Sequence, residues 1–280
     1  MTLLVVFMRR VLSHFEMVFA SDSRLSNGQR IDFGQKVFQT PRSDALIAFA
    51  GDTDYAFPLL MQTMRAIEGY PLSSSRRLPL PKLKRHILRV FQQTYDAIHT
   101  LPFDAVHPEP PDNYFLLGGY DWQSQRFRAW RLAFDKNLRL FVYRPILRSG
   151  GKKYFFAGDN KRAVSDAVRR TDELLSERGK GNDEIDLEPF EVLSSVISES
   201  PKSSTIGGVP QIGKAYQHLN TQLFQVSWPL PEGNDWLHVA GRPLLPGERC
   251  LLPVFDPKRG FYASWPDVQQ DQEDNGDSPE

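Results

Sequence analysis

Two residues of opposite charge, Asp22 and Lys36, stand at the edges of segments that otherwise read as buried core. The stretch FASDSRLSNGQRIDFGQKVF (19–38) begins as an apolar strand, continues with Asp22 and Arg24, and reaches Lys36 just before another apolar run. Either residue alone would usually be solvated or structurally paired. A carboxylate and an ammonium group can also form a charge-assisted hydrogen bond that holds a lysine beside a nucleophile and tunes it. The functional question is therefore which nucleophile lies next to them.

The other reactive residue types do not form a recognisable site. The single cysteine, Cys250, excludes an internal disulfide framework and a cysteine-based zinc site. The segments GGYDW and SGGKK predict turns and lack the lysine and hydroxyl pair of a phosphate-binding loop. We expect neither a metal nor a cofactor, because the six histidines have no metal-ligand spacing. They are His14, His86, His99, His107, His218 and His238.

Composition sets the class of protein. With 280 residues and 40% hydrophobic content, the chain is long enough for one large globular domain. Its 34 basic and 34 acidic residues balance, which argues against nucleic acid or an anionic membrane as the main partner. The first ten residues, MTLLVVFMRR, are too short an apolar run to span a bilayer and lack the charged front of a secretory signal. We therefore expect a cytoplasmic protein with no membrane contact.

Apolar runs predict the strands and helices that must position any site. In the first half, strands are expected in two pairs before a helix at 54–70, which Asp52 or Thr53 can cap, and a second helix at 82–99. In the second half, strands precede two helices, at 160–177 and 187–198, and further strands close the domain. The expected strands are 3–7, 16–20, 36–40, 45–51, 113–121, 126–134, 138–144, 154–158, 206–216 and 223–228.

This order predicts an α+β domain in which two antiparallel sheets lie between helical layers, a four-layer αββα sandwich. We assign it to residues 1–228. Residues 229–265, rich in proline and glycine, are expected to form a C-terminal extension, either a strap or a small lobe. Residues 266–280 are expected to be a disordered acidic tail.

The motifs then suggest a family. The order of strand, SDSR, about a dozen residues, KVF, strand, AFAGD and helix resembles the β-type subunits of the proteasome and of the bacterial heat-shock proteasome-like peptidases, which are N-terminal-nucleophile hydrolases. The resemblance is strongest from Thr2 to about Leu60 and weaker from Tyr154 to Gln225. The region after Pro229 lies outside it.

The resemblance implies a catalytic set. The family nucleophile is a threonine that cleavage exposes as the first residue, and Thr2 takes that place once Met1 is removed. A threonine hydroxyl needs a base, and the α-amine of the same residue, with a reference pKa of about 7.7 to 8.0, can accept its proton. Lys36 would disfavour the charged form of that amine, and Asp22 would hold Lys36 in place. Gly51, in AFAGD, matches the position whose backbone N–H stabilises the oxyanion.

The same comparison implies a substrate cleft. Ser26 matches a position that pairs with the extended substrate backbone. Leu25, Phe49 and Thr53 match positions that shape the pocket beside the scissile bond. Their size and apolar character favour a modest hydrophobic side chain over an acidic or basic one.

Three positions depart from the family pattern. Asp159, in FAGDN, stands where a serine assists the nucleophile, and its charge would raise the pKa of the terminal amine. Ser203 and Ile206, before Gly207 and Gly208, replace a supporting acid and serine. The expected catalytic residues are thus kept, and the residues that would support them are changed.

The sequence thus predicts a threonine-type endopeptidase that cleaves peptide or unfolded protein substrates. By resemblance, it would form a homo-oligomer with a protected chamber and could work with an ATP-dependent unfoldase. Two alternatives stay open. One is a proteasome-like scaffold or interaction module without activity, and the other is a small-molecule amidase that uses the same residues.

Overall fold

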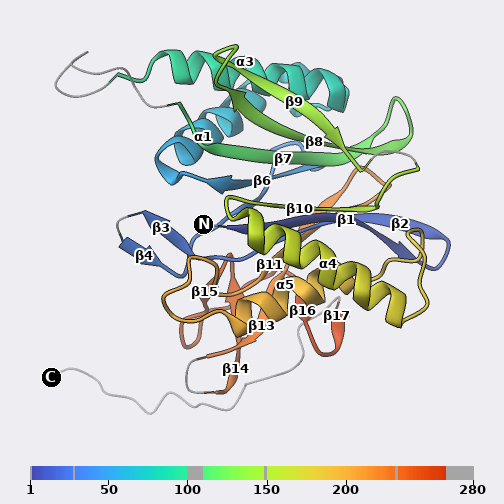
Figure 1. Ribbon diagram of the computed structural model, residues 1–280. Coiled ribbons are helices and arrows are strands. Elements are labelled where there is room, and N and C mark those ends of the chain that lie inside the picture. The colour runs from blue at the N-terminus through green and yellow to red at the C-terminus, as the bar shows by residue number, and fades with distance from the viewer. Residues whose placement is uncertain (1, 28, 100–109, 148–149, 231–232, 263–280) are drawn as a thin grey trace, which may run out of the picture.

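The computed structural model describes residues 2–27, 29–99, 110–147, 150–230 and 233–262. Two five-stranded sheets lie face to face, with α1 and α3 on one side and α4 and α5 on the other (Figure 1). A third five-stranded sheet, from the end of the chain, lies below them in the figure. The prediction of a mixed α and β fold with several antiparallel sheets is confirmed.

The sheet that begins the chain is buried on both faces. Leu3 and Val5 enter the core cluster under α4 and α5, whereas Leu4 and Val6 enter the cluster between the two sheets. Since side chains alternate along a strand, residue 2 falls on the side of Leu4 and Val6, so the strand directs Thr2 toward the second sheet. In spatial order the strands are β10 (Tyr154–Gly158), β1 (Leu3–Val11), β2 (His14–Ser21), β11 (Gln211–Ala215) and β12 (Thr221–Leu223).

The second sheet packs its outer face under α1 (Thr53–Gly69) and α3 (Leu80–Asp96). Along β6, Ile47 and Phe49 point to these helices, and Leu46 points to the first sheet. Asp52 caps α1, because its carboxylate accepts the N–H of Asp54 at 3.0 Å. The strands, in spatial order, are β5 (Val37–Gln39), β6 (Ala45–Gly51), β7 (Asn113–Asp121), β8 (Arg126–Asp135) and β9 (Leu140–Ile146).

The other two long helices, α4 (Lys161–Glu177) and α5 (Glu188–Glu199), cover the free face of the first sheet. The side chain of Asn160 caps α4 by accepting two backbone N–H groups at 3.0 and 3.1 Å. Asp159 is therefore fixed between the end of β10 and the start of a capped helix.

The third sheet packs onto the first through α5 and shares its core. Val226 and Phe255 are buried in the cluster that contains Phe190 of α5, and the rings of Phe190 and Phe255 are 4.8 Å apart. The expected acidic tail, 266–280, lies outside the described residues. The strands are β15 (Arg242–Pro243), β14 (Asp235–Val239), β13 (Gln225–Pro229), β16 (Val254–Asp256) and β17 (Gly260–Tyr262).

Two loops hold more regular structure than the sequence suggested. The segment 72–81, which separates the two expected helices, contains most of α2 (Pro71–Ser74) and the first residues of α3. This helix begins earlier than expected because proline is well tolerated in the first turn of a helix. Between Asp22 and Lys36, a short hairpin of β3 (Leu25–Asn27) and β4 (Gln29–Ile31) forms where only a loop was expected. None of the described helices is long and apolar enough to cross a membrane.

Candidate active site

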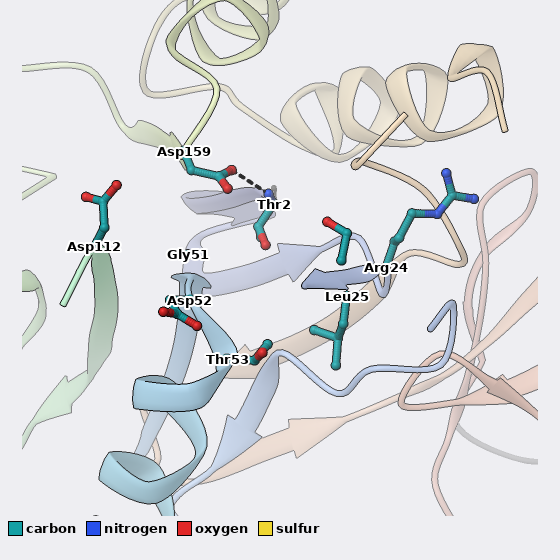
Figure 2. A pocket seen from close by; sticks show the side chains of 9 residues that line it. Thr2, Arg24, Leu25, Gly51, Asp52, Thr53, Asp112 and Asp159 are labelled. Atoms are coloured by element: carbon teal, nitrogen blue, oxygen red, sulfur yellow. Dashed lines mark hydrogen bonds between the residues drawn. The ribbon is translucent and has the colours of Figure 1, made fainter. Parts of the chain in front are cut away.

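A cavity of about 190 Å³ opens beside the start of β1. Its volume is below the roughly 300 Å³ at which pockets begin to enclose a small molecule, so it would hold only part of a substrate. Figure 2 shows Thr2 between Asp159 and the start of α1. Leu25 and Asp112 lie on opposite sides of Thr2 in this view. The lining residues are Thr2, Arg24, Leu25, Ser26, Gly51, Asp52, Thr53, Asp112 and Asp159.

Thr2 lies at the inner wall, with only 3% of its surface exposed. Its backbone nitrogen donates a hydrogen bond to Oδ1 of Asp159 at 2.7 Å (Figure 2). With Met1 attached this nitrogen is a peptide N–H, and without Met1 it would be an amine at the same position. The carboxylate of Asp159 is thus placed to stabilise a positive charge on the nitrogen of Thr2.

Asp22 and Lys36 form a fully buried ion pair next to Thr2. Lys36 Nζ lies 2.9 Å from Asp22 Oδ1, and the same oxygen accepts the N–H of Leu3 at 3.0 Å. The other carboxylate oxygen accepts the N–H groups of Gly207 at 3.2 Å and Arg24 at 3.3 Å. Four donors therefore converge on Asp22, and one of them belongs to the residue that follows Thr2.

Burial dominates the electrostatics of this pair. Desolvation raises the pKa of Asp22 and lowers the pKa of Lys36, and the attraction between the two charges opposes both shifts. The charge of Asp159 also raises the pKa of Lys36, while Arg24 lowers it. Lys36 is thus in electrostatic contact with two residues that line the cavity.

Gly51 closes the floor of the cavity where β6 ends and α1 begins. Its φ of 105° is in the region that favours glycine, and a Cβ there would lie 2.3 Å from the carbonyl oxygen of Asp112. The next residues, Asp52 and Thr53, line the cavity at the helix N-terminus, where backbone N–H groups favour negative charge.

The β3 strand forms the opposite wall. Leu25 and Ser26 line the cavity, and Arg24 is held at its edge. The guanidinium of Arg24 pairs with Asp32 at 2.5 Å and donates to the carbonyl oxygen of Ser204 at 2.7 Å. These partners of Arg24 lie outside the cavity, and Asp32 is shared with Arg30.

Eight of the nine residues expected from the sequence lie in or directly behind this cavity. The exception is Phe49, whose ring is fully buried in the cluster beneath α1, 5.3 Å from the ring of Phe57. The strand alternation explains this position, because odd-numbered residues of β6 face the helices, and the role of Phe49 in shaping the substrate pocket stays a prediction. Neither Ser203 nor Ile206 lines the cavity, and the backbone of Gly207 supports Asp22 instead.

The cavity is more acidic than the sequence suggested. Asp52, Asp112 and Asp159 contribute three carboxylates, so the lining is not the apolar pocket that was expected. Asp112 was missed, although the pairing of β6 with β7 could have found it: Gly51 is the register partner of Asn113. Among the described residues, no group of three histidines, cysteines or acids is arranged to hold a metal ion.

Comparisons with known proteins support the fold alone. No protein-family model matches the sequence, and no curated protein matches it. A solved structure, the Anbu (Gly-1) mutant from Hyphomicrobium sp. strain MC1, matches with a TM-score of 0.53 and 13% identity over 79% of this chain and 85% of that chain. The chain therefore has a fold similar to that of this Anbu structure over most of its length.

Proposed function

We propose that this protein is a threonine-type peptide hydrolase of the N-terminal-nucleophile class, with Thr2 as its nucleophile after removal of Met1. The two facing sheets and their helical layers then correspond to the four-layer αββα sandwich of that class. The observation that carries the proposal is the buried carboxylate of Asp22, which bridges Lys36 Nζ and the N–H of Leu3 directly beside Thr2.

In the proposed reaction, the α-amine of Thr2 takes the proton of its own hydroxyl as Oγ1 attacks the substrate carbonyl carbon. The N–H of Gly51 stabilises the oxyanion that forms on the carbonyl oxygen. The ammonium group returns the proton to the leaving amide nitrogen, the C–N bond breaks, and an ester on Thr2 remains. Water, activated by the same amine, then hydrolyses the ester, releasing the acid and restoring Thr2.

The buried pair sets the electrostatics of this step. Lys36 disfavours a second positive charge on the amine and so favours the neutral form that can act as a base. Asp159 acts in the opposite direction, since its carboxylate accepts a hydrogen bond from the Thr2 nitrogen. Activity should therefore depend on the pKa of the Thr2 amine, which Lys36 would lower and Asp159 would raise.

The contact between Asp159 and Thr2 also supports a second candidate, a proteasome-like scaffold without activity. In that case the carboxylate would hold the nitrogen as an unreactive ammonium group. Amidase action on a small molecule would use the same residues and is separated from peptide hydrolysis by substrate screening. In either active form, the fold similarity to Anbu supports assembly into a homo-oligomer, which could receive unfolded substrates from an ATP-dependent unfoldase.

Hydrolysis of short fluorogenic peptides by Thr2→Ala tests the proposal. Alanine is also a small second residue, so Met1 should still be removed and only the hydroxyl is lost. We expect turnover to disappear while the fold is kept. Thr171→Ala is the matched control, because that buried hydroxyl donates to the carbonyl oxygen of Ala167 within α4 and does not line the cavity. Unchanged turnover in Thr2→Ala would refute the assignment of the nucleophile.

A further inference from the structure

The side chain of Gln211 holds the backbone on both sides of the Lys36 peptide. Its Oε1 accepts the N–H groups of Lys36 at 2.9 Å and Val37 at 3.2 Å. Its Nε2 donates to the carbonyl oxygens of Gly34 at 2.6 Å and Ala240 at 3.3 Å. Only 5% of Gln211 is exposed, so water cannot easily replace these bonds.

The side chain of Gln211 thereby makes the hydrogen bonds that a neighbouring strand would make to the backbone of Lys36. On one side, the carbonyl oxygen of Lys36 accepts the N–H of Phe49 from β6. On the other side no strand among the described residues pairs with Lys36, and the carboxamide of Gln211 accepts its N–H instead. Gln211 is also the register partner of Ser21, which precedes Asp22. One residue thus ties the backbones of both members of the ion pair together.

The third sheet reaches this residue through the turn between β14 and β15. Ala240 and Gly241 form the turn with φ values of 50° and 88°. A Cβ on Gly241 would lie 2.4 Å from Cβ of Ser23 and 3.2 Å from Nε2 of Gln211. The turn therefore packs against the residue after Asp22 and against the side chain that holds Lys36.

We propose that Gln211 is a positioning residue for Lys36 and that the β14–β15 turn fixes Gln211 in this orientation. The inference rests on the proposed function, in which Lys36 acts on Thr2. A lysine side chain is long and flexible, so its ammonium group is placed only if both its tip and its backbone are fixed. Asp22 fixes the tip, and Gln211 fixes the backbone. The C-terminal sheet is then part of the catalytic support.

The test measures how fast a peptide epoxyketone, an electrophile that reacts with an N-terminal threonine, modifies Thr2 across a range of pH. A displacement of about 1 Å in a catalytic group can cost on the order of 100-fold in rate. We expect Gln211→Leu, which has a similar size and no hydrogen bonds, to slow the reaction by roughly 10- to 100-fold per folded molecule. Gln211→Glu keeps an acceptor for the two N–H groups and, while its carboxyl group is protonated, a donor to the carbonyl oxygens of Gly34 and Ala240, so it should retain more of the rate than Gln211→Leu.

The pH profile separates positioning from a structural role. Lys36 is faced by Asp22, Asp159 and Arg24, and these groups stay the same in every variant. In Gln211→Leu, which adds no charge, a displaced Lys36 would disfavour the charged form of the Thr2 amine less, so the midpoint of the rate profile should move to higher pH. A purely structural residue would change the fraction of folded protein and leave that midpoint unchanged.

The chain offers a matched control for each change. Gln225 is a fully buried glutamine whose Nε2 donates to the carbonyl oxygens of Cys250 and Leu252, away from Lys36, so Gln225→Leu should leave rate and midpoint unchanged. Gly233 shares a positive φ with Gly241, but a Cβ there would meet nothing within 4 Å. We expect Gly241→Ala to slow the modification of Thr2 and Gly233→Ala to leave it unchanged.

The outcomes distinguish the two proposals. If the wild-type protein is not modified at Thr2 at any pH, the proposed function fails. If the wild type is modified and both Gln211 variants react at its rate with its midpoint, the inference on Gln211 fails and the proposed function stands. If Gln211→Leu does not fold, Gln211→Glu and Gly241→Ala decide the question by the same readouts.

Discussion

Replacing Lys36 with methionine tests the buried ion pair and predicts a loss of stability that depends on pH. Methionine has a similar length, so Lys36→Met removes the charge without opening a large cavity. The change leaves the carboxylate of Asp22 fully buried without its cation. Breaking a buried pair by removing one partner costs about 3–5 kcal/mol.

The structure places the expected loss near the lower end of that range, at about 3 kcal/mol. Asp22 would still accept three backbone N–H groups, from Leu3, Arg24 and Gly207, and these stabilise its charged form. A loss of this size is a large part of the roughly 5–15 kcal/mol that stabilises a typical domain. Activity of Lys36→Met must therefore be measured under conditions where the variant is folded.

The sign of the pH dependence follows from Asp22. Burial already raises its pKa, and loss of Lys36 removes the largest influence that opposes this rise. A carboxyl group whose pKa is higher in the folded state stabilises the fold at low pH and loses that contribution as pH rises through the folded value. The deficit of Lys36→Met relative to the wild type should therefore be small near pH 4 and should grow toward pH 8.

Urea unfolding of both proteins at several pH values between 4 and 8 measures this deficit. Lys84→Met is the matched control, because Lys84 is a buried lysine that packs over the rings of Tyr143 and Trp130. Its removal leaves no buried carboxylate behind, so its effect should not grow with pH. If Lys36→Met at pH 8 is within about 1 kcal/mol of the wild type and shows no trend with pH, the assignment of a charged, buried pair is wrong.

Two further predictions concern the acidic lining. Asp159→Asn keeps an acceptor for the Thr2 nitrogen and removes the negative charge at position 159. The pKa of the amine should then fall, and the acidic limb of the pH–rate profile should move to lower pH. An unchanged profile would show that Asp159 does not act on the amine. Because Asp52, Asp112 and Asp159 line the cavity, peptides with glutamate beside the scissile bond should be cleaved more slowly than matched glutamine peptides, and Asp112→Asn should narrow the difference in kcat/KM. Equal kcat/KM values for the two wild-type reactions would contradict an acidic substrate site.

Much of the fold could be predicted because its strands carry strong local signals. The β-branched and aromatic runs at 3–7 and 45–50 are buried on both faces, which gives continuous apolar segments. The amphipathic stripes of α1 and α4 similarly gave their approximate bounds. Proline in the first turn of α3 concealed where that helix begins.

The candidate site was predictable only in part, since it depends on contacts between distant segments. The order of Thr2, Asp22, Lys36 and Gly51 could be matched to a known motif. The role of Gln211 could not, because its bonds to Lys36 join residues 175 positions apart in the sequence. The burial of Phe49 beneath α1 could not be predicted either, because the motif gives its position in the chain but not the face of β6 on which it lies.

The central claim is that Thr2 becomes a free N-terminal nucleophile. Its most direct test is mass spectrometry of the wild-type protein after reaction with a peptide epoxyketone, with the adduct mapped to a residue. We expect a chain that lacks Met1 and carries the adduct on Thr2, and no adduct in Thr2→Ala. An intact Met1 throughout the population, or an adduct confined to another residue, would contradict the claim.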